Sequence, residues 1–93
     1  MHVTHESDGK KGKFTLFEND RQAGFMTYTM ANEIMIIDHT EVDRAFEGKG
    51  LGKQLVEAGI EHARQNSLKI KPLCPFALKT MQRKGDEVKD ILF

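Results

Sequence analysis

With 93 residues, the chain is long enough for a single domain spanning 1–93 with a modest core, and its one cysteine cannot form an internal disulfide, so we expect a reducing, cytoplasmic location. Fourteen basic and fourteen acidic side chains give a formal net charge of zero, which argues against a nucleic-acid partner. No stretch approaches the ~20 apolar residues of a membrane span and the polar N-terminus does not resemble a signal peptide, so we expect no membrane partner.

Three strands are predicted in the first half of the chain, after a polar, glycine-containing loop over residues 7–12. The predicted strands are residues 13–18, 22–30 and 34–42. Short turn sequences with Asn and Asp separate them, which favours an antiparallel meander. The third strand opens with four apolar residues, 34–37, and this unbroken run predicts a central strand that is buried on both faces.

A helix is predicted over residues 51–65, where the periodicity is the clearest of the chain. At about 100° per residue, apolar and small residues fall on one half of the helix surface and charged residues on the other, so one face should pack on the sheet. The inward set is Leu51, Gly52, Leu55, Val56, Gly59, Ile60 and Ala63. Gly59 costs about 1 kcal/mol of helix propensity relative to Ala, which makes sense if helix and sheet approach closely there.

A parallel strand and a second helix are predicted to follow. Residues 69–73 have the pattern of a strand, so the third strand, the helix and this strand would form a parallel βαβ unit. Pro72 cannot donate a ladder hydrogen bond, which predicts an edge strand or one that stops pairing near its end. A helix over 76–84 and a short apolar segment over 88–93 complete the chain.

Glycines alternate just before the first helix, in the sequence Glu47-Gly48-Lys49-Gly50-Leu51-Gly52-Lys53. Such a loop leaves backbone N–H groups uncovered, and the helix N-terminus adds about half a positive charge. Lys49 and Lys53 add two full charges. The combination predicts a cradle for a phosphate or pyrophosphate, with a glycine-containing turn that binds no ligand as the alternative.

Two common phosphate-binding motifs do not fit this loop. A P-loop requires glycine where Glu47 lies and a serine or threonine where Gln54 lies. The dinucleotide-binding fingerprint fails because Lys53 takes the place of its last glycine. What remains is a Gly-x-Gly turn between a strand and a helix.

This loop and two neighbouring stretches together resemble a known family. The loop is similar to the acyl-coenzyme A loop Gln/Arg-x-x-Gly-x-Gly/Ala of the Gcn5-related N-acetyltransferase (GNAT) family, with Gly50 and Gly52 at its glycine positions and Glu47 as a departure at its first position. The stretches His39-Thr40-Glu41-Val42 and Pro72-Leu73-Cys74-Pro75-Phe76 resemble a minimal GNAT subfamily of about this chain's length, which carries a His-Thr-x-Val strand end and a Cys-Pro-Phe/Tyr motif.

The resemblance implies a GNAT fold, which is an α/β architecture with an antiparallel meander, a βαβ unit, a splayed coenzyme A cleft and a C-terminal helix. It implies an N-acetyltransferase that moves the acetyl group of acetyl-CoA to a primary amine by direct attack, without a metal. The coenzyme A contacts that it implies are Thr40, Val42, Glu47, Gly48, Lys49, Gly50, Leu51, Gly52, Lys53, Cys74, Pro75 and Phe76. In the family the pantetheine arm pairs with the strand before the loop, which would bring the thioester near His39 and Cys74.

Cys74, His39 and Glu41 are the candidate catalytic residues. The Cys74 thiol could accept the acyl group or protonate the leaving thiolate, and a buried structural cysteine is the alternative. His39 could take a proton from the attacking ammonium or simply end the strand as a polar residue, and Glu41 shares its strand face. Many GNAT enzymes use a tyrosine after the last cleft strand as general acid, but the one tyrosine here is Tyr28, which leaves Cys74 as the substitute.

The acceptor is the least determined part of the interpretation. The chain lacks the two helices that wall the acceptor site of most GNAT proteins, so the resemblance implies an open, shallow site. A protein or peptide amine would supply the missing contacts from its own surface. A non-catalytic acyl-CoA binding or sensing module is the alternative function, and a small interaction domain without a ligand is a third. We expect a monomer or a weak homo-oligomer, with His2, His5 and His62 at the surface and no metal site.

Overall fold

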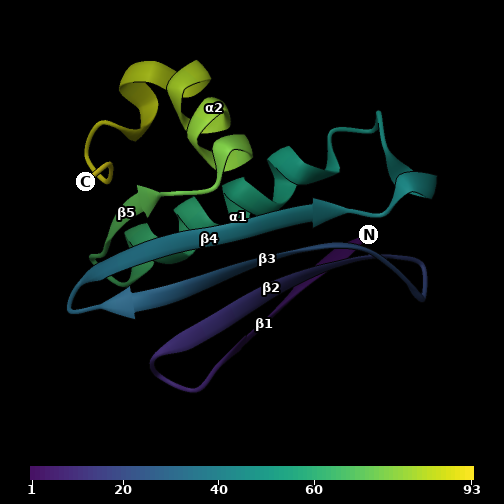
Figure 1. Cartoon of the computed structure of the whole chain (residues 1–93), viewed down its shortest axis with the longest axis horizontal. Helices are drawn as coiled ribbons and strands as arrows, with labels where there is room; N and C mark the ends of the chain where they lie inside the picture. The colour runs from purple at the N-terminus through teal and green to yellow at the C-terminus, as the bar shows by residue number, and fades with distance from the viewer.

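A five-stranded sheet carries helices on one of its faces in the computed structural model, which describes all residues 1–93 (Figure 1). The strands are β1 His2–Ser7, β2 Lys11–Glu18, β3 Arg21–Ala31, β4 Ile34–Val42 and β5 Lys69–Pro72. The helices are α1 Leu51–Gln65 and α2 Pro75–Lys84, with 3₁₀ turns η1 Arg44–Phe46 and η2 Gly85–Val88. The spatial order of the strands follows the sequence, and all pairings are antiparallel except that of β4 with β5. The predicted meander and βαβ unit are both confirmed.

An N-terminal strand that the sequence did not predict precedes the meander. β1 pairs with β2 from His2 opposite Phe17 to Ser7 opposite Gly12. All six residues of β1 are exposed, so no alternation of apolar and polar residues marks it as a strand. It is held by the ladder and by ring stacking such as that of His5 on Phe14. Of the loop predicted over residues 7–12, only residues 8–10 form the turn, because Ser7 ends β1 and Lys11 begins β2.

The hydrophobic core lies between α1 and the sheet. All seven residues predicted for the inward face of α1 are buried, and the helix begins and ends at the predicted residues. The sheet contributes alternate residues of its inner strands, including Leu16, Met26, Met35 and Ile37. A Cβ on Gly59 would lie 2.8 Å from Cε of Met26, so the predicted close approach of helix and sheet is confirmed.

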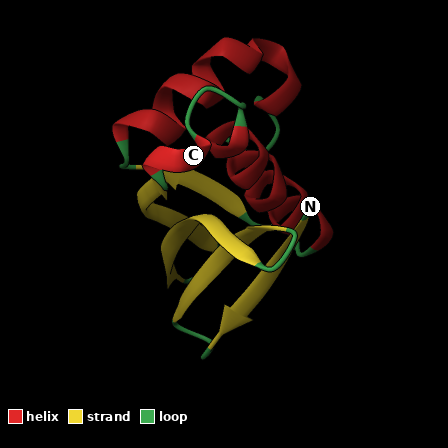
Figure 2. Cartoon of the chain, turned by 90° about the vertical axis from the view of Figure 1, so that its right-hand side faces the viewer, coloured by secondary structure: helices red, strands yellow, loops and turns green.

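The other face of the sheet is uncovered, because both helices lie on the same side (Figure 2). At the start of β4, Met35 and Ile37 are buried while Ile34 and Ile36 remain partly exposed. The prediction that this apolar run is buried on both faces is therefore wrong. Neither helix has the length and the apolar character needed to cross a membrane.

β4 and β5 pair over only part of β4, and this opens a cleft. Their register runs from Ile34 opposite Lys69 to Ile37 opposite Pro72. The carbonyl of Ile37 then accepts hydrogen bonds from the N–H groups of residues 73 and 74, both at 3.1 Å. Beyond that point β4 continues to Val42 while the chain turns into α2, so one edge of residues 38–42 has no strand partner.

The C-terminal segment lies against the far side of β5. The N–H of Phe93 donates to the carbonyl of Ile70 at 2.9 Å, and Leu92 forms an isolated parallel bridge with the same residue. β5 is the last strand of the sheet, as the presence of Pro72 predicted, and this short bridge is its only pairing on the outer side.

Candidate functional site

The glycine-rich loop forms an open turn at the entrance to α1. Gly48 and Gly50 have φ angles of +84° and +72°, in the left-handed region that favours glycine. A Cβ on either residue would meet nothing within 4 Å. The backbone conformation therefore requires glycine at both positions, and the space in front of their peptide groups is free.

Unpaired backbone N–H groups face this space at the start of α1. Gly50 is the N-cap and makes no side-chain cap. The first helical hydrogen bond runs from the N–H of Gln54 to the carbonyl of Gly50 at 3.3 Å. The N–H groups of residues 51–53 consequently have no helical acceptor, and they lie at the positive end of the helix dipole.

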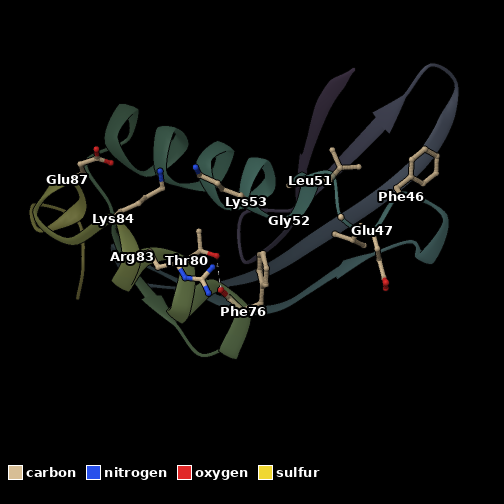
Figure 3. A pocket seen from close by; sticks show the side chains of 13 residues that line it. Phe46, Glu47, Leu51, Gly52, Lys53, Phe76, Thr80, Arg83, Lys84 and Glu87 are labelled. Carbon is tan, nitrogen blue, oxygen red and sulfur yellow. Dashed lines mark hydrogen bonds between the residues drawn. The ribbon is translucent and has the colours of Figure 1, made fainter.

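Gly52 serves the packing of the two helices. A Cβ at this position would lie 2.6 Å from ring carbon Cζ of Phe76, so only glycine lets the first turn of α2 approach the first turn of α1. Phe76 remains 42% exposed. Its ring stands at the pocket beside the loop (Figure 3).

A pocket of about 640 Å³ opens beside the loop, between the start of α1 and α2 (Figure 3). Its volume is within the range of pockets that hold small molecules. The lining residues are Val42, Phe46, Glu47, Gly48, Gly50, Leu51, Gly52, Lys53, Phe76, Thr80, Arg83, Lys84 and Glu87. Most of the coenzyme A contacts that the resemblance implied are among them, whereas Thr40, Lys49, Cys74 and Pro75 are not.

Lys49 does not contribute its charge to the pocket. Its Nζ lies 3.4 Å from Oε2 of Glu18 and 5.4 Å from the centre of the Phe46 ring. The expectation that both loop lysines face the same anion therefore fails for Lys49, and Lys53 is the loop lysine that lines the pocket.

Two further cations come from α2, and the sequence pattern did not predict them. Arg83 and Lys84 line the pocket together with Lys53 (Figure 3). Lys84 is engaged by Glu57 of α1 at 2.9 Å, but neither Arg83 nor Lys53 forms an ion pair within the chain. The helical spacing from Phe76, with residues 80, 83 and 84 on the same face, was the signal that could have revealed them.

Cys74 lies at the inner end of the cleft as the N-cap of α2, and it is only 5% exposed. Burial raises the pKa of its thiol, but the N–H of Ala77, the Thr40 side chain and the N–H of Phe76 lower the pKa by more. The net result is a thiol whose pKa lies below its ordinary value. Oγ1 of Thr40 is buried and makes no hydrogen bond of normal geometry, so this hydroxyl retains capacity for a ligand atom.

His39 and Glu41 lie on the opposite side of the sheet from Thr40. The register of β4 against β3 shifts at Asp38, which is the extra residue of a β-bulge. Thr40 is consequently opposite the buried Met26 and shares its face, while His39 and Glu41 project from the uncovered face. Their side chains are 58% and 62% exposed, and Nε2 of His39 lies 3.5 Å from Oε1 of Glu41. Cys74 therefore lies at the cleft on the face of the sheet that the helices cover, and His39 and Glu41 lie on the uncovered face.

Tyr28 points away from the cleft, so its hydroxyl does not replace the missing acid. Its ring lies over Gly12, and His5 Nε2 is 2.5 Å from its hydroxyl oxygen. The ring of His5 is also 4.4 Å from that of His62. His5 is exposed and His62 is partly exposed, as expected of surface residues. They nevertheless belong to one aromatic cluster with Phe14 and Tyr28, which the sequence did not predict.

No group of three or more His, Cys, Asp or Glu side chains is arranged to hold a metal ion. The groups of this site that suit an anion are the side chains of Lys53 and Arg83 and the N–H groups of residues 51–53. The open edge of residues 38–42 and the Thr40 hydroxyl suit a ligand with amide groups, because both offer backbone or side-chain hydrogen bonds.

Comparison with known proteins agrees with this geometry. Residues 13–91 match the model of a family described as GCN5-related N-acetyl-transferase. No curated protein matches the sequence. A GCN5-like putative N-acetyltransferase from Staphylococcus aureus, solved by NMR, is 36% identical with a TM-score of 0.66. That match covers 97% of this chain and 87% of the other.

Two more distant solved structures share the fold. The ribosomal-protein-S18-alanine N-acetyltransferase from Escherichia coli is 18% identical with a TM-score of 0.73, over 85% of this chain and 54% of that one. A Bacillus subtilis acetyltransferase in complex with CoA is 24% identical with a TM-score of 0.68, over 82% of this chain and 54% of that one. The chain therefore spans about half the length of these two proteins. Because the family model covers most of its residues, the chain belongs to the GCN5-related N-acetyltransferase family.

Proposed function

We propose that this protein transfers the acetyl group of acetyl-CoA to a primary amine. The observation that carries the proposal is the open glycine loop at the start of α1, which lies beside the cleft between β4 and β5. An anion cradle next to an unpaired strand edge suits a ligand with a pyrophosphate at one end and an extended amide-containing arm at the other. Membership of the GNAT family gives the same cofactor.

The residues around the loop fit the phosphate end of coenzyme A. The N–H groups of residues 51–53 would bind the pyrophosphate, and the open space at Gly48 and Gly50 would admit it. Lys53 and Arg83 would supply positive charge from two sides of the pocket. Glu47 and Lys49 would lie at the rim, and Phe76 would pack against the ligand.

The pantetheine arm would lie along the open edge of β4. Thr40 and Val42 belong to this edge, and the Thr40 hydroxyl has no partner of normal geometry within the chain. Cys74 and Pro75 border the other side, where α2 begins. In this proposal the acyl end would lie between the Cys74 thiol and the pair formed by His39 and Glu41.

Cys74, His39 and Glu41 would carry out the proton transfers of the reaction. His39, assisted by Glu41, takes a proton from the acceptor ammonium, so that the nitrogen lone pair can attack the thioester carbonyl carbon. The new C–N bond forms, the C–S bond breaks, and the Cys74 thiol gives its proton to the departing sulfur. The second proton, which the acetylated nitrogen loses, returns through water to the Cys74 thiolate, and the proton held by His39 leaves to solvent. The products are an N-acetyl amide and free coenzyme A.

The sequence around Cys74 supports placement in the minimal subfamily with a Cys-Pro-Phe/Tyr motif. Pro75 occupies the first turn of α2, where its missing N–H costs nothing. Phe76 fits against Gly52, so the motif and the glycine loop meet in space. Within this proposal, residues 1–93 act as one domain.

A non-catalytic acyl-CoA binding or sensing module is the second candidate. The exposure of His39 and Glu41 favours it, because a general base usually works in a more enclosed site. The two functions share the coenzyme site and differ in turnover. Acetyl transfer to a panel of amines, followed by mass spectrometry, separates them.

A matched pair of glycine variants tests the coenzyme site. Gly50→Val places a branched side chain over the cradle, whereas Gly9→Val introduces the same strain at an open glycine with φ +92° in the β1–β2 turn. Charge-assisted hydrogen bonds are worth about 1.5–3 kcal/mol each, so losing two should weaken acetyl-CoA binding at least ~100-fold in Gly50→Val. Calorimetry should give wild-type affinity for Gly9→Val. Equal affinity in the two variants would contradict the proposed cradle.

A further inference from the structure

We propose that the free edge of β1 pairs antiparallel with β1 of a second copy of this chain, which joins the two sheets into one continuous sheet. β1 lies at one edge of the sheet and β5 at the other (Figure 1). The cleft of the proposed function lies between β4 and β5, at the far edge. The inference therefore does not depend on that function.

The two edges of the sheet are protected to different degrees. At the β5 edge, Pro72 removes a backbone donor and the C-terminal segment forms a bridge with Ile70. β1 has neither device, because its six residues include no proline or lysine and pair with β2 without a register shift. All six residues are exposed. A regular, exposed edge strand of this kind is a template for another strand.

The alternation of hydrogen bonds shows which peptide groups of β1 are free. The N–H of Met30 donates to the carbonyl of Lys10 at 2.6 Å, and in an antiparallel pair every second residue is bonded to the partner strand. Phe14 of β2 therefore turns its peptide groups to β3, while residues 13 and 15 turn theirs to β1. These two residues lie opposite residues 6 and 4. The N–H and carbonyl groups of residues 3, 5 and 7 consequently point to the free edge.

A two-fold axis at Thr4 pairs these free groups with one another. Val3 then lies opposite His5 of the second copy, and each of the two residues donates its N–H to the other's carbonyl. Thr4 faces Thr4 across the axis, and His2 faces Glu6 of the second copy on both sides of it. A histidine beside a carboxylate and a threonine beside a threonine are both favourable cross-strand pairs.

Other registers lose this complementarity. With His5 on the axis, the two His5 side chains face each other and Glu6 faces Thr4. With Val3 on the axis, fewer residues of β1 overlap. A shift by one residue brings the free groups of one strand opposite groups that already bond to β2. The strand is therefore self-complementary in one register.

Exposed apolar side chains at this edge also favour a second copy. Val3 is 37% exposed although it lies opposite Leu16 on the face of the sheet that α1 covers. In the dimer, His5 of the second copy lies beside Val3 and covers part of it. Met1, which is 57% exposed, comes to lie opposite Ser7. A strand edge is small beside the roughly 1,200–2,000 Å² of stable interfaces, so we expect a reversible dimer.

Analytical ultracentrifugation of the full chain over a wide concentration range tests this self-association. We expect a monomer–dimer equilibrium in the wild type. Val3→Pro removes an N–H that the β1–β2 ladder does not use, and it directs ring atoms toward the second copy. This variant should stay monomeric at every concentration, with a urea midpoint close to that of the wild type. Val3→Thr is the matched control, because it keeps the N–H and should still dimerise.

A charge exchange tests the register without changing the backbone. His2 and Glu6 are four residues apart in β1, about 13 Å at 3.3 Å per residue, so they do not contact each other within one chain. His2→Glu places like charges opposite each other twice and should weaken the dimer about three- to tenfold. Addition of Glu6→Lys to this variant should restore the affinity.

Amide hydrogen exchange gives a readout for single residues. The N–H groups of residues 3 and 5 should gain protection as the protein concentration rises, whereas those of residues 4 and 6 should be protected at every concentration. A wild type that stays monomeric, equal dimerisation of Val3→Pro and the wild type, or no rescue by the double variant would overturn the inference. The Kd for acetyl-CoA should be the same in all variants, and a wild type that fails to bind acetyl-CoA would reject the proposed function alone.

Discussion

Cys74 is buried, and its thiol also lies where nearby donors favour the thiolate. It is buried, which by itself raises the pKa of a thiol, yet the N–H of Ala77, the Thr40 side chain and the N–H of Phe76 lower the pKa below its ordinary value. An inert core cysteine would show only the first effect. The start of α2 therefore stabilises the thiolate, and this favours a thiol that gives up its proton during turnover.

Replacement of this thiol should affect turnover more than stability. We expect Cys74→Ala to lower kcat about 100-fold, the lower range of general acid–base catalysis, with the Kd for acetyl-CoA changed less than threefold. Intact-protein mass spectrometry after incubation with acetyl-CoA should show no stable adduct if the thiol acts as an acid. An added acetyl group that is labile to hydroxylamine would instead identify Cys74 as an acyl carrier. Full activity in Cys74→Ala, at wild-type stability, would show that the thiol is structural.

The helices and loops whose conformation depends on local sequence were predicted well. The bounds and inward face of α1 follow from periodicity within fifteen residues. The glycine loop follows from alternating glycines before a helix. β1 could not be predicted in this way, because its residues are all exposed and its strand conformation depends on pairing with β2. This segment is a strand because it pairs with β2 in the sheet, and its own residues do not indicate a strand.

The bulge at Asp38 shows why the candidate catalytic residues were harder to place. Sequence predicted that His39 and Glu41 share a face, and their 3.5 Å contact agrees with this. It did not predict that this face is the uncovered one. The extra residue inserts a shift of one position between Ile37 and His39, so the strand's inward set changes from odd to even numbers. A bulge of this kind is defined by the pairing of β4 with β3, so the residues of β4 alone do not reveal it.

The charge of the pocket depends in the same way on helix packing. Lys49 and Lys53 are equivalent in the sequence pattern, but Lys49 turns to Glu18 and only Lys53 lines the pocket. Arg83 lines the same pocket because Gly52 and Phe76 allow α2 to pack against α1. Because the loop N–H groups and Lys53 suit a pyrophosphate, we infer that Arg83, on the α2 side of the pocket, faces a further phosphate of the ligand.

A charge change on α2 should therefore distinguish coenzyme A from its form without the 3′-phosphate. We expect Arg83→Gln to weaken coenzyme A binding about tenfold, the lower range for an exposed charge-assisted contact, and to leave the affinity for dephospho-coenzyme A almost unchanged. Lys79→Gln is the matched control, because Lys79 is an exposed cation of the same helix outside the pocket. Calorimetric titration of both ligands measures this, and an equal loss for the two would place Arg83 at the pyrophosphate instead.

The two edges of the sheet differ in how they are paired and packed. The β4–β5 end opens into the cleft, so its pairing is incomplete. The β1 end is closed by the cluster in which His5 contacts Phe14 and Tyr28 of the sheet and His62 of α1. This cluster joins an otherwise exposed edge strand to the core. The stability of that edge should depend on the charges of His5 and His62.

Acidification should weaken this end of the molecule. Burial lowers the pKa of His5, with a contribution from the charge of His62, and burial also lowers the pKa of His62. The unfolded chain therefore binds more protons than the folded protein as the pH falls from about 6.5 toward these lowered values, and the free energy of unfolding must decrease in that window. Above pH 6.5 the contribution is fully present. The carboxyls of Asp8 and Asp90, whose pKa values are also lowered, titrate below 3.8 and do not interfere.

Urea unfolding at pH 7.5 and pH 5.5 measures this effect in the wild type and in His62→Gln. We expect the midpoint of the wild type to fall on acidification, and the fall to be smaller in His62→Gln, because the variant keeps a neutral polar group where the second positive charge would form. His2→Gln is the control, since His2 stacks on Phe17 outside the cluster. Hydrogen exchange should locate the change, with the amides of β1 losing protection at pH 5.5 before those of β4. A pH dependence that is the same in all three proteins would show that the cluster does not hold β1 to the core.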